Sequence, residues 1–173
     1  MKEKERDFLL EKAMVEYGDQ LTRLAYSYVK DADMAKDLVQ NTFIKCYTTI
    51  ETFRHESTLK TWLYRITINE CKDYLKSWSY KKFLLLELYN SNNNSSLSPE
   101  EVAIKNWEKG RVKSTIFSLP PKYREIIFLY YYEELTMEEI STLLGLPIST
   151  VKTRIRRGKD RLKQTIERKE INE

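Results

Sequence analysis

The chain has 173 residues, of which 41% are hydrophobic and 32% charged, with four glycines and a formal net charge of +4. This composition favours a helical protein with real apolar cores, arranged as one medium domain or two small ones. No apolar run is long enough to cross a membrane, and the charged start Met1–Arg6 does not lead into the apolar stretch of a secretory signal. We therefore expect a cytoplasmic protein without membrane insertion.

Patterns typical of catalysis or metal binding are missing from the sequence. Cys46 and Cys71 lack a CxxC or Cys/His spacing, His55 is the only histidine, and no glycine-rich phosphate loop is present. In a reducing compartment the two cysteines are expected to be buried thiols. We expect no metal, no other cofactor and no enzymatic activity.

Residues 1–80 predict a first helical domain. An apolar stripe over Leu21–Tyr28 is followed by a short break at Lys30–Asp33, and residues 35–50 then keep one unbroken apolar helical face. The helix that follows the polar loop Glu51–Ser57 carries two apolar stripes on different sides. Such a helix is either sandwiched between neighbours or presents aromatic side chains to a partner.

A linker is predicted over residues 81–98. The tract Tyr89–Ser96 consists mostly of Asn and Ser and cannot bury apolar surface, so we expect it to be flexible. The apolar segment Phe83–Leu86 either extends the first domain or docks transiently, and the sequence leaves both alternatives open. Ser98–Glu101 then restarts a helix, with a Ser cap and Pro at the first helical position.

The remaining residues, 99–173, predict a second helical domain. Its first helix is expected to break at Leu119–Pro121, where two prolines follow each other. Thr136–Glu139 reads as a capping box that opens a short helix, and Gly145 is placed to end that helix in a left-handed conformation. A last helix is expected to open around Pro147, which suits a first helical turn.

This last helix has an apolar and a basic face. Six residues with small or apolar side chains fall on one side: Ile148, Val151, Ile155, Gly158, Leu162 and Ile166. Polar and cationic residues fall opposite: Ser149, Lys152, Thr153 and Arg156. A short helix, a tight turn and such a helix are typical of a helix-turn-helix, in which Lys and Arg bind phosphates and short polar or forked side chains bind base edges. A solvated basic helix on a bundle is the alternative, but capping, turn and face separation together favour DNA binding.

Three motifs now resemble a known family. Leu119-Pro-Pro-Lys-Tyr-Arg-Glu-Ile-Ile, Leu135-Thr-Met-Glu-Glu-Ile-Ser and Thr150-Val-Lys-Thr-Arg-Ile-Arg-Arg resemble region 4 of bacterial sigma factors, especially the small extracytoplasmic-function (group IV) class. In the first domain, Asp37–Lys45 and Thr61–Asn69 are similar to region 2 of that class. In three places this chain departs from the family: it has Tyr47 where Trp is frequent, Lys76 where Arg is common and Gly158 where Ala is usual. Gly158 weakens the last helix by roughly 1 kcal/mol relative to Ala, although it could permit close backbone packing.

The resemblance implies an all-α fold of two small domains joined by a flexible linker. It also implies an alternative sigma factor of the stress-response type, which binds core RNA polymerase, recognises the −35 and −10 promoter elements and promotes DNA melting. Residues 99–173 would bind the −35 element, and residues 1–80 would bind the −10 element and the polymerase. An anti-sigma factor is the further partner that the class predicts.

Three sets of site residues follow from the resemblance together with the helical faces. On the last helix, the −35 element is expected to meet Ser149, Thr150, Lys152, Thr153, Arg156, Arg157 and Lys159. The −10 element, from which a flipped base is captured, is expected to meet Phe53, Arg54, Glu56, Ser57, Thr58, Trp62, Arg65 and Asn69. The clamp helices of the largest polymerase subunit are expected to meet Asp37, Gln40, Asn41, Ile44 and Lys45. For Phe53 and Trp62, ordinary core packing is an open alternative.

Two other classes of protein share some of these sequence features. A response-regulator or quorum-type transcription factor has a similar helix-turn-helix, but residues 1–78 lack the alternating strands and helices of a receiver domain. A dimerising helical adaptor would leave the cationic last helix unexplained.

Overall fold

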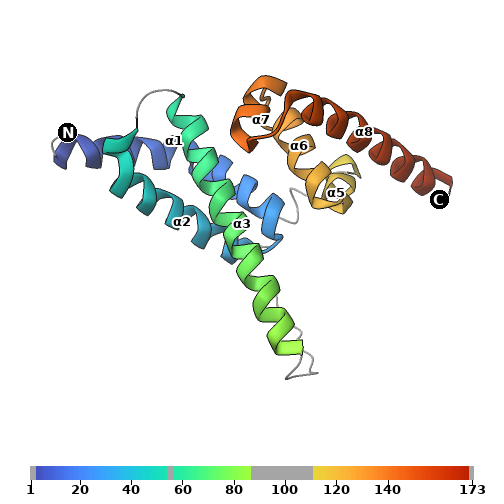
Figure 1. Ribbon diagram of the computed structural model, residues 1–173, viewed down its shortest axis with the longest axis horizontal. Coiled ribbons are helices and arrows are strands. Elements are labelled where there is room, and N and C mark those ends of the chain that lie inside the picture. The colour runs from blue at the N-terminus through green and yellow to red at the C-terminus, as the bar shows by residue number, and fades with distance from the viewer. Residues whose placement is uncertain (1–2, 54–56, 87–110, 172–173) are drawn as a thin grey trace. The chain divides into compact units, whose positions relative to one another are not determined.

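A computed structural model describes residues 3–53, 57–86 and 111–171 (Figure 1). All regular structure in these ranges is helical, and the chain divides into two compact units, Met1–Glu101 and Val102–Glu173. The predicted all-α fold with two helical domains is therefore confirmed. Most of the predicted linker and the helix start at Ser98–Glu101 lie outside the described residues, so the exact domain boundary stays a prediction.

The described part of the N-terminal unit consists of three long helices and one short turn: α1 (Glu3–Val29), α2 (Ala32–Thr49), the 3-10 turn η1 (Ile50–Thr52) and α3 (Leu59–Leu86). The predicted break after α1 is confirmed. Lys30 adopts a left-handed conformation with φ of 56°, and the Asp31 carboxylate then caps α2 by accepting a hydrogen bond from the Met34 N–H at 2.8 Å.

The core of this unit lies where α1, α2 and α3 pack against one another (Figure 1). Each helix contributes fully or nearly fully buried apolar side chains: Leu21 and Leu24 from α1, Leu38 and Phe43 from α2, Leu63 and Ile68 from α3. Between α2 and α3, the buried hydroxyls of Thr42 and Thr67 lie 3.2 Å apart and are hydrogen-bonded. The first half of α3 is thus sandwiched between its neighbours, whereas Trp78 near its end is 46% exposed.

The helix α3 runs further along the chain than the predicted first domain. We expected the linker to begin at residue 81, but α3 continues to Leu86 and includes Phe83–Leu86. The reason is local: the segment Tyr80–Leu86 contains Lys and Leu, which are strong helix formers, and neither Gly nor Pro to end the helix. Phe83–Leu86 therefore continue α3, and their assignment to the first domain or to the linker stays a prediction.

Four described helices form the C-terminal unit: α5 (Arg111–Ser118), α6 (Pro121–Tyr131), α7 (Met137–Leu144) and α8 (Ile148–Ile171). The predicted break between α5 and α6 is present, and the buried Arg124 guanidinium stabilises it by donating to the carbonyl oxygens of Phe117 and Leu119, each at 3.2 Å. These contacts satisfy carbonyls that the end of α5 leaves without helical partners.

The helix-turn-helix signals are found in the structure as predicted, with one shift. The Thr136 N–H donates to Glu139 Oε2 at 2.8 Å and the Glu139 N–H donates to Thr136 Oγ1 at 3.1 Å, which completes the capping box. Gly145 ends α7 with φ of 64°. Pro147 stands just before α8 instead of inside its first turn, and its carbonyl accepts the N–H groups of Thr150 and Val151.

The core of this unit is centred on α6. Ile126, Ile127, Phe128 and Leu129 are buried, and they lie among the buried side chains of α7 and α8, which include Ile140, Val151 and Ile155. Gly158 lies directly against α6, because a Cβ atom placed there would be 2.8 Å from Cγ1 of Ile127. The close packing that the sequence suggested at Gly158 is therefore present.

Candidate nucleic-acid and partner interfaces

The polar face of α8 is the first candidate surface. Ser149, Lys152 and Arg156 are exposed, whereas Val151 and Ile155 on the other side are buried at 0% and 5% exposure. Between Ile148 and Leu162, Asp160 is the sole acidic residue. The predicted separation of faces is present, so α8 offers a cationic surface on the side that its own domain does not cover.

A hollow of about 350 Å³ lies beside this face, between the start of α6 and the first half of α8. We call it the basic notch; it is lined by Lys122, Tyr123, Ser149, Thr150, Thr153, Arg154 and Arg157. It brings together four residues predicted for the −35 element with two residues of α6 that the sequence analysis missed. Only tertiary packing places the start of α6 next to α8, and no spacing along the chain signals it.

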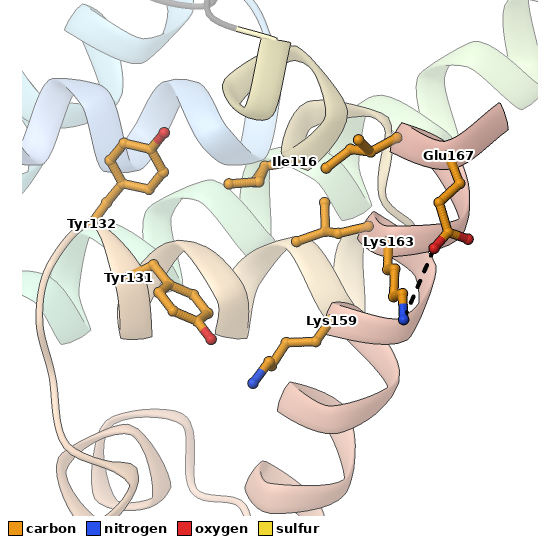
Figure 2. Close-up of a pocket in the computed structure, with 8 residues that line it drawn as sticks. Ile116, Tyr131, Tyr132, Lys159, Lys163 and Glu167 are labelled. Atoms are coloured by element: carbon orange, nitrogen blue, oxygen red, sulfur yellow. Dashed lines mark ion pairs between the residues drawn. The ribbon is translucent and has the colours of Figure 1, made fainter. Parts of the chain in front are cut away.

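Lys159 lies elsewhere on α8. It lines an apolar hollow of about 660 Å³ together with Ile116, Tyr131, Tyr132, Leu162, Lys163, Ile166 and Glu167 (Figure 2). At this hollow Lys163 and Glu167 form an ion pair at 3.9 Å. Burial raises the pKa of Tyr132. Lys159 therefore lies apart from the basic notch, although it belongs to the same predicted −35 set as four of the notch residues.

The loop and helix expected at the −10 element are partly described. Phe53 and Trp62 are half-buried, with ring centroids 5.1 Å apart and planes tilted by 33°. Arg65 is half-buried and Asn69 is exposed, and their spacing places both on the same side of α3 as Trp62. Ser57 is also half-buried, whereas Arg54 and Glu56 lie outside the described residues.

Thr58 has a structural task at the start of α3. Its Oγ1 accepts a hydrogen bond from the Thr61 N–H at 3.1 Å, and its carbonyl accepts the Trp62 N–H at 3.0 Å. A Thr in this position caps the helix. The orientation of the first turn of α3, and with it the ring of Trp62, therefore depends on Thr58.

The predicted polymerase-binding residues form one exposed stripe on α2. All five are exposed, including Ile44 at 55%: Asp37, Gln40, Asn41, Ile44 and Lys45. Lys45 is ion-paired with Glu70 of α3, so it is tied to the neighbouring helix. Leu38, Val39 and Phe43, which we expected inside, are buried.

A groove of about 570 Å³ runs beside this stripe, between α1 and α2. Gln40 and Ile44 line it from α2, and Leu10 and Met14 line it from α1. The sequence analysis missed the contribution of α1. Of the two α1 residues, Met14 is 49% exposed, so α1 presents apolar surface at the groove that its own core does not cover.

The Tyr47 hydroxyl takes part in two hydrogen bonds, and the family that the sequence resembles often has Trp at this position. Arg6 Nη2 donates to the Tyr47 oxygen at 3.1 Å, and Tyr47 donates to Asp7 Oδ1 at 2.9 Å. The Arg6 guanidinium also lies 4.1 Å from the centre of the Tyr47 ring. The hydrogen bond that Arg6 donates to Tyr47 raises the pKa of Arg6. These contacts join the start of α1 to the end of α2.

The two cysteines are buried, as predicted. Burial raises the pKa of Cys46 to about 11 and that of Cys71 to about 12. Among the described residues, no group of His, Cys, Asp and Glu is arranged to hold a metal ion.

Comparison with known proteins decides the family. The family description Sigma-70 region 2 matches residues 14–79, and Sigma-70, region 4 matches residues 110–162. The ECF RNA polymerase sigma factor SigW of Bacillus subtilis (strain 168) is 31% identical over 158 residues, which cover 87% of this chain and 84% of SigW. The chain belongs to the extracytoplasmic-function (ECF) family of RNA polymerase sigma factors. The ECF RNA polymerase sigma-E factor of Escherichia coli (strain K12) is likewise 31% identical, over 162 residues that cover 89% of this chain and 84% of that protein.

The fold agrees with that of two solved structures. The sigma factor RpoE in complex with the anti-sigma factor NepR from Bartonella quintana matches with a TM-score of 0.72 at 23% identity, covering 94% of this chain and 98% of that one. CnrH in complex with the cytosolic domain of CnrY matches with a TM-score of 0.66 at 23% identity, covering 91% of this chain and 87% of CnrH.

Family membership establishes the function in outline. The protein is an alternative sigma factor that acts in transcription initiation, and the transcription-factor and adaptor alternatives do not hold. The family is not generally catalytic. None of the described helices is long and apolar enough to span a membrane.

Proposed function

We propose that this ECF sigma factor recognises the −35 element by placing the polar face of α8 in the major groove. The observation that carries the proposal is the burial of Val151 and Ile155 beside the exposure of Lys152 and Arg156, because only the cationic face is free to enter a groove. Ser149 and Thr153, near the N-terminal end of α8, have the short polar side chains that suit base edges.

Two neighbouring arginines test this division of work. Arg156 lies within the exposed base-facing row, whereas Arg157 lines the basic notch and is expected at a phosphate. Arg156→Ala should relax base preference at one position, since an Arg bidentate to guanine discriminates by ~1–3 kcal/mol. Arg157→Ala should weaken all promoters about equally. Equal profiles for the two variants across a promoter library, read with the reconstituted holoenzyme, would contradict the assignment.

At the −10 element, we propose that the Phe53–Trp62 pair and the adjoining face of α3 capture an unstacked base. Two half-exposed aromatic rings at the end of a loop provide a stacking surface, and Arg65 and Asn69 lie where polar contacts to a base edge are useful. Arg54, Glu56 and Ser57 belong to the same proposal, while Thr58 would act by holding the first turn of α3.

Permanganate footprinting of promoter melting tests the loop. A triple alanine variant at Phe53, Arg54 and Glu56 should leave closed-complex formation intact and abolish reactive thymines around the start site. A double alanine variant at Lys81 and Lys82, which are exposed cations near the end of α3, serves as the control and should melt DNA normally. Normal melting by the triple variant would remove the loop from the mechanism.

For polymerase binding, we propose that the exposed stripe of α2 and the groove beside it receive the clamp helices of the largest subunit. An exposed isoleucine next to an apolar groove suits a helix laid against it. Ile44→Asp should abolish co-purification with core polymerase. Val15→Asp is the matched control, because Val15 is 85% exposed but does not line the groove, and it should retain binding. Loss of binding in both variants, or in neither, would contradict the assigned surface.

We further propose an anti-sigma factor as a regulatory partner, because the similar sigma factor RpoE was solved in complex with the anti-sigma factor NepR. The chain would act in the cytoplasm, where polymerase and promoter DNA are found, and would catalyse no reaction of its own. Purification from cells followed by mass spectrometry tests both partners together. Recovery of the polymerase β′ chain supports the core of the proposal, and its repeated absence would overturn it.

A further inference from the structure

Two side chains of the basic notch come from α6 and not from α8, which carries the proposed −35 surface. α6 begins at Pro121, so Lys122 and Tyr123 stand in its first turn. Lys122 is exposed, whereas Tyr123 is 5% exposed and packs with Leu119 and Ile127 in the core. The notch therefore joins a firmly held ring on α6 to the cationic first half of α8.

Positive charge is concentrated around that ring. Lys122 Nζ and Arg161 Cζ each lie 5.1 Å from the centre of the Tyr123 ring, and the Arg157 side chain is within hydrogen-bonding reach of the Tyr123 hydroxyl. Burial by itself would raise the pKa of Tyr123, but Lys122, the hydrogen bond from Arg157 and the charge of Arg161 together lower it.

This charge has no acidic counterpart inside the notch. None of the described residues that line it is acidic, and none of the ion pairs formed by the described part of the chain involves Lys122, Arg154 or Arg157. Three cations held near one another without a carboxylate repel each other, and an anion placed between them would remove that repulsion.

The donors in the notch suit a phosphate. Lys offers a point charge, the two arginines offer forked donors, and Thr150 adds a hydroxyl, which are the groups that bind phosphate oxygens in protein–DNA interfaces. The Thr153 hydroxyl donates to the Ser149 carbonyl at 2.9 Å. Ser149 and Thr153 also belong to the surface proposed to face base edges, so an anion in the notch would lie beside the bases being read.

We propose that the basic notch binds one phosphodiester of the promoter backbone in the −35 region, with Lys122 as a ligand and Tyr123 as the residue that positions Arg157. This inference rests on the proposed binding of the −35 element by α8. Because Lys122 comes from α6 and the arginines come from α8, one phosphate would tie two helices to a single point of the duplex. That contact fixes the register and tilt of α8 without reading sequence.

The test uses holoenzyme reconstituted from core polymerase and a promoter selected by the wild-type protein from a random library. Affinity is measured against salt concentration for wild type, Lys122→Ala and Lys122→Arg. Loss of one phosphate contact on duplex DNA should reduce the salt slope of log affinity by about 0.9, so that between about 50 and about 200 mM salt Lys122→Ala loses about 3.5-fold less affinity than wild type. Lys122→Arg keeps the charge and should retain the wild-type slope.

Lys163→Ala is the control for simple loss of a lysine. Lys163 lies on α8 with a 78% exposed side chain, already has Glu167 as a counter-charge and does not line the notch. Its removal should leave the slope unchanged. Tyr123→Phe keeps the core ring and should reproduce part of the Lys122→Ala effect by releasing Arg157.

Single methylphosphonate substitutions along the −35 element locate the phosphate. Neutralising one specific phosphate should weaken wild-type binding, and it should weaken Lys122→Ala by a smaller factor, because only the contacts from α8 are left to lose. Equal slopes and equal methylphosphonate profiles for wild type and Lys122→Ala, on a promoter that still requires its −35 element, would overturn the notch proposal alone. Competition by inorganic phosphate at constant ionic strength, with no dependence on any methylphosphonate position, would assign the notch to a free anion and equally overturn it. Wild-type binding that does not depend on the −35 element would instead contradict the proposed function of α8, on which the notch proposal rests.

Discussion

Gly158 gives the sharpest prediction about stability, because two effects of opposite sign meet at one atom. Ala is favoured over Gly in a helix interior by about 1 kcal/mol, so Gly158→Ala in the middle of α8 should stabilise the protein if propensity alone mattered. The added Cβ, however, would lie 2.8 Å from Cγ1 and 3.0 Å from Cδ1 of Ile127.

The size of the clash decides the sign. A separation of 2.8 Å is about 0.7 Å inside the shortest favourable carbon–carbon distance of about 3.5 Å. Ile127 is 0% exposed, so it can withdraw only by disturbing other core side chains. Overpacking of this kind costs about 1–3 kcal/mol. We therefore expect Gly158→Ala to lower the free energy of unfolding by about 1 kcal/mol net.

A graded series at Ile127 tests the reasoning. Ile127→Val removes only Cδ1 and should reduce the cost of Gly158→Ala, and Ile127→Ala removes Cγ1 as well and should turn the cost into the gain of about 1 kcal/mol that propensity predicts. Urea unfolding followed by circular dichroism gives the free energies, and hydrogen exchange of the α8 amides assigns the change to the C-terminal unit. A stabilising Gly158→Ala in the wild-type background, or equal effects in all three backgrounds, would refute the argument.

Two further predictions concern stability. Thr136→Ala should lower the free energy of unfolding by about 1 kcal/mol, because it removes one half of the capping box. Thr142→Ala, at an exposed position in the same helix, is the control and should change this free energy by less than about 0.5 kcal/mol. Equal losses for the two variants in urea unfolding would show that the cap contributes nothing. The pKa values of Cys46 and Cys71, raised to about 11 and about 12, predict that stability is insensitive to these thiols below about pH 9 and falls as pH rises above it, since the unfolded chain then releases protons that the folded chain holds. Urea midpoints between about pH 8 and about pH 10 should show this slope in wild type and a smaller one in a Cys46→Ala, Cys71→Ala variant; the same slope in both would exclude the thiols as its source.

Features set by nearby residues could be predicted from the sequence. The capping box of Thr136 and Glu139, the left-handed Gly145 and the break at Lys30 depend on contacts within a few positions, and all three are present. The buried and exposed sides of α8 also followed from spacing, because a helix that must cover a core has only one way to turn its apolar residues.

Features that depend on packing between distant segments could not be read in this way. The basic notch exists because Tyr123 of α6 packs beside α8, and the groove on the first unit exists because Met14 lies near Ile44. The separation of Lys159 from the notch has the same origin, since at its position two turns beyond Lys152 the neighbours of α8 are Ile116 of α5 and Tyr131 of α6, which line the apolar hollow. Helical spacing gives the angle of each side chain but not the neighbour that it meets.

The two proposed surfaces of the first unit share one rigid support. α2 carries the stripe proposed for the polymerase, and α3 carries Trp62, Arg65 and Asn69, proposed for the −10 element. The buried Thr42–Thr67 hydrogen bond and the Lys45–Glu70 ion pair join these helices, and Glu70 directly follows Asn69 in the chain. Packed helices resist small shifts because the surrounding core has no space to absorb them. A polymerase clamp held on α2 would therefore fix the α3 face in space, so that the position of the −10 contacts relative to the polymerase is determined by the core of this unit and does not require a separate contact to set it.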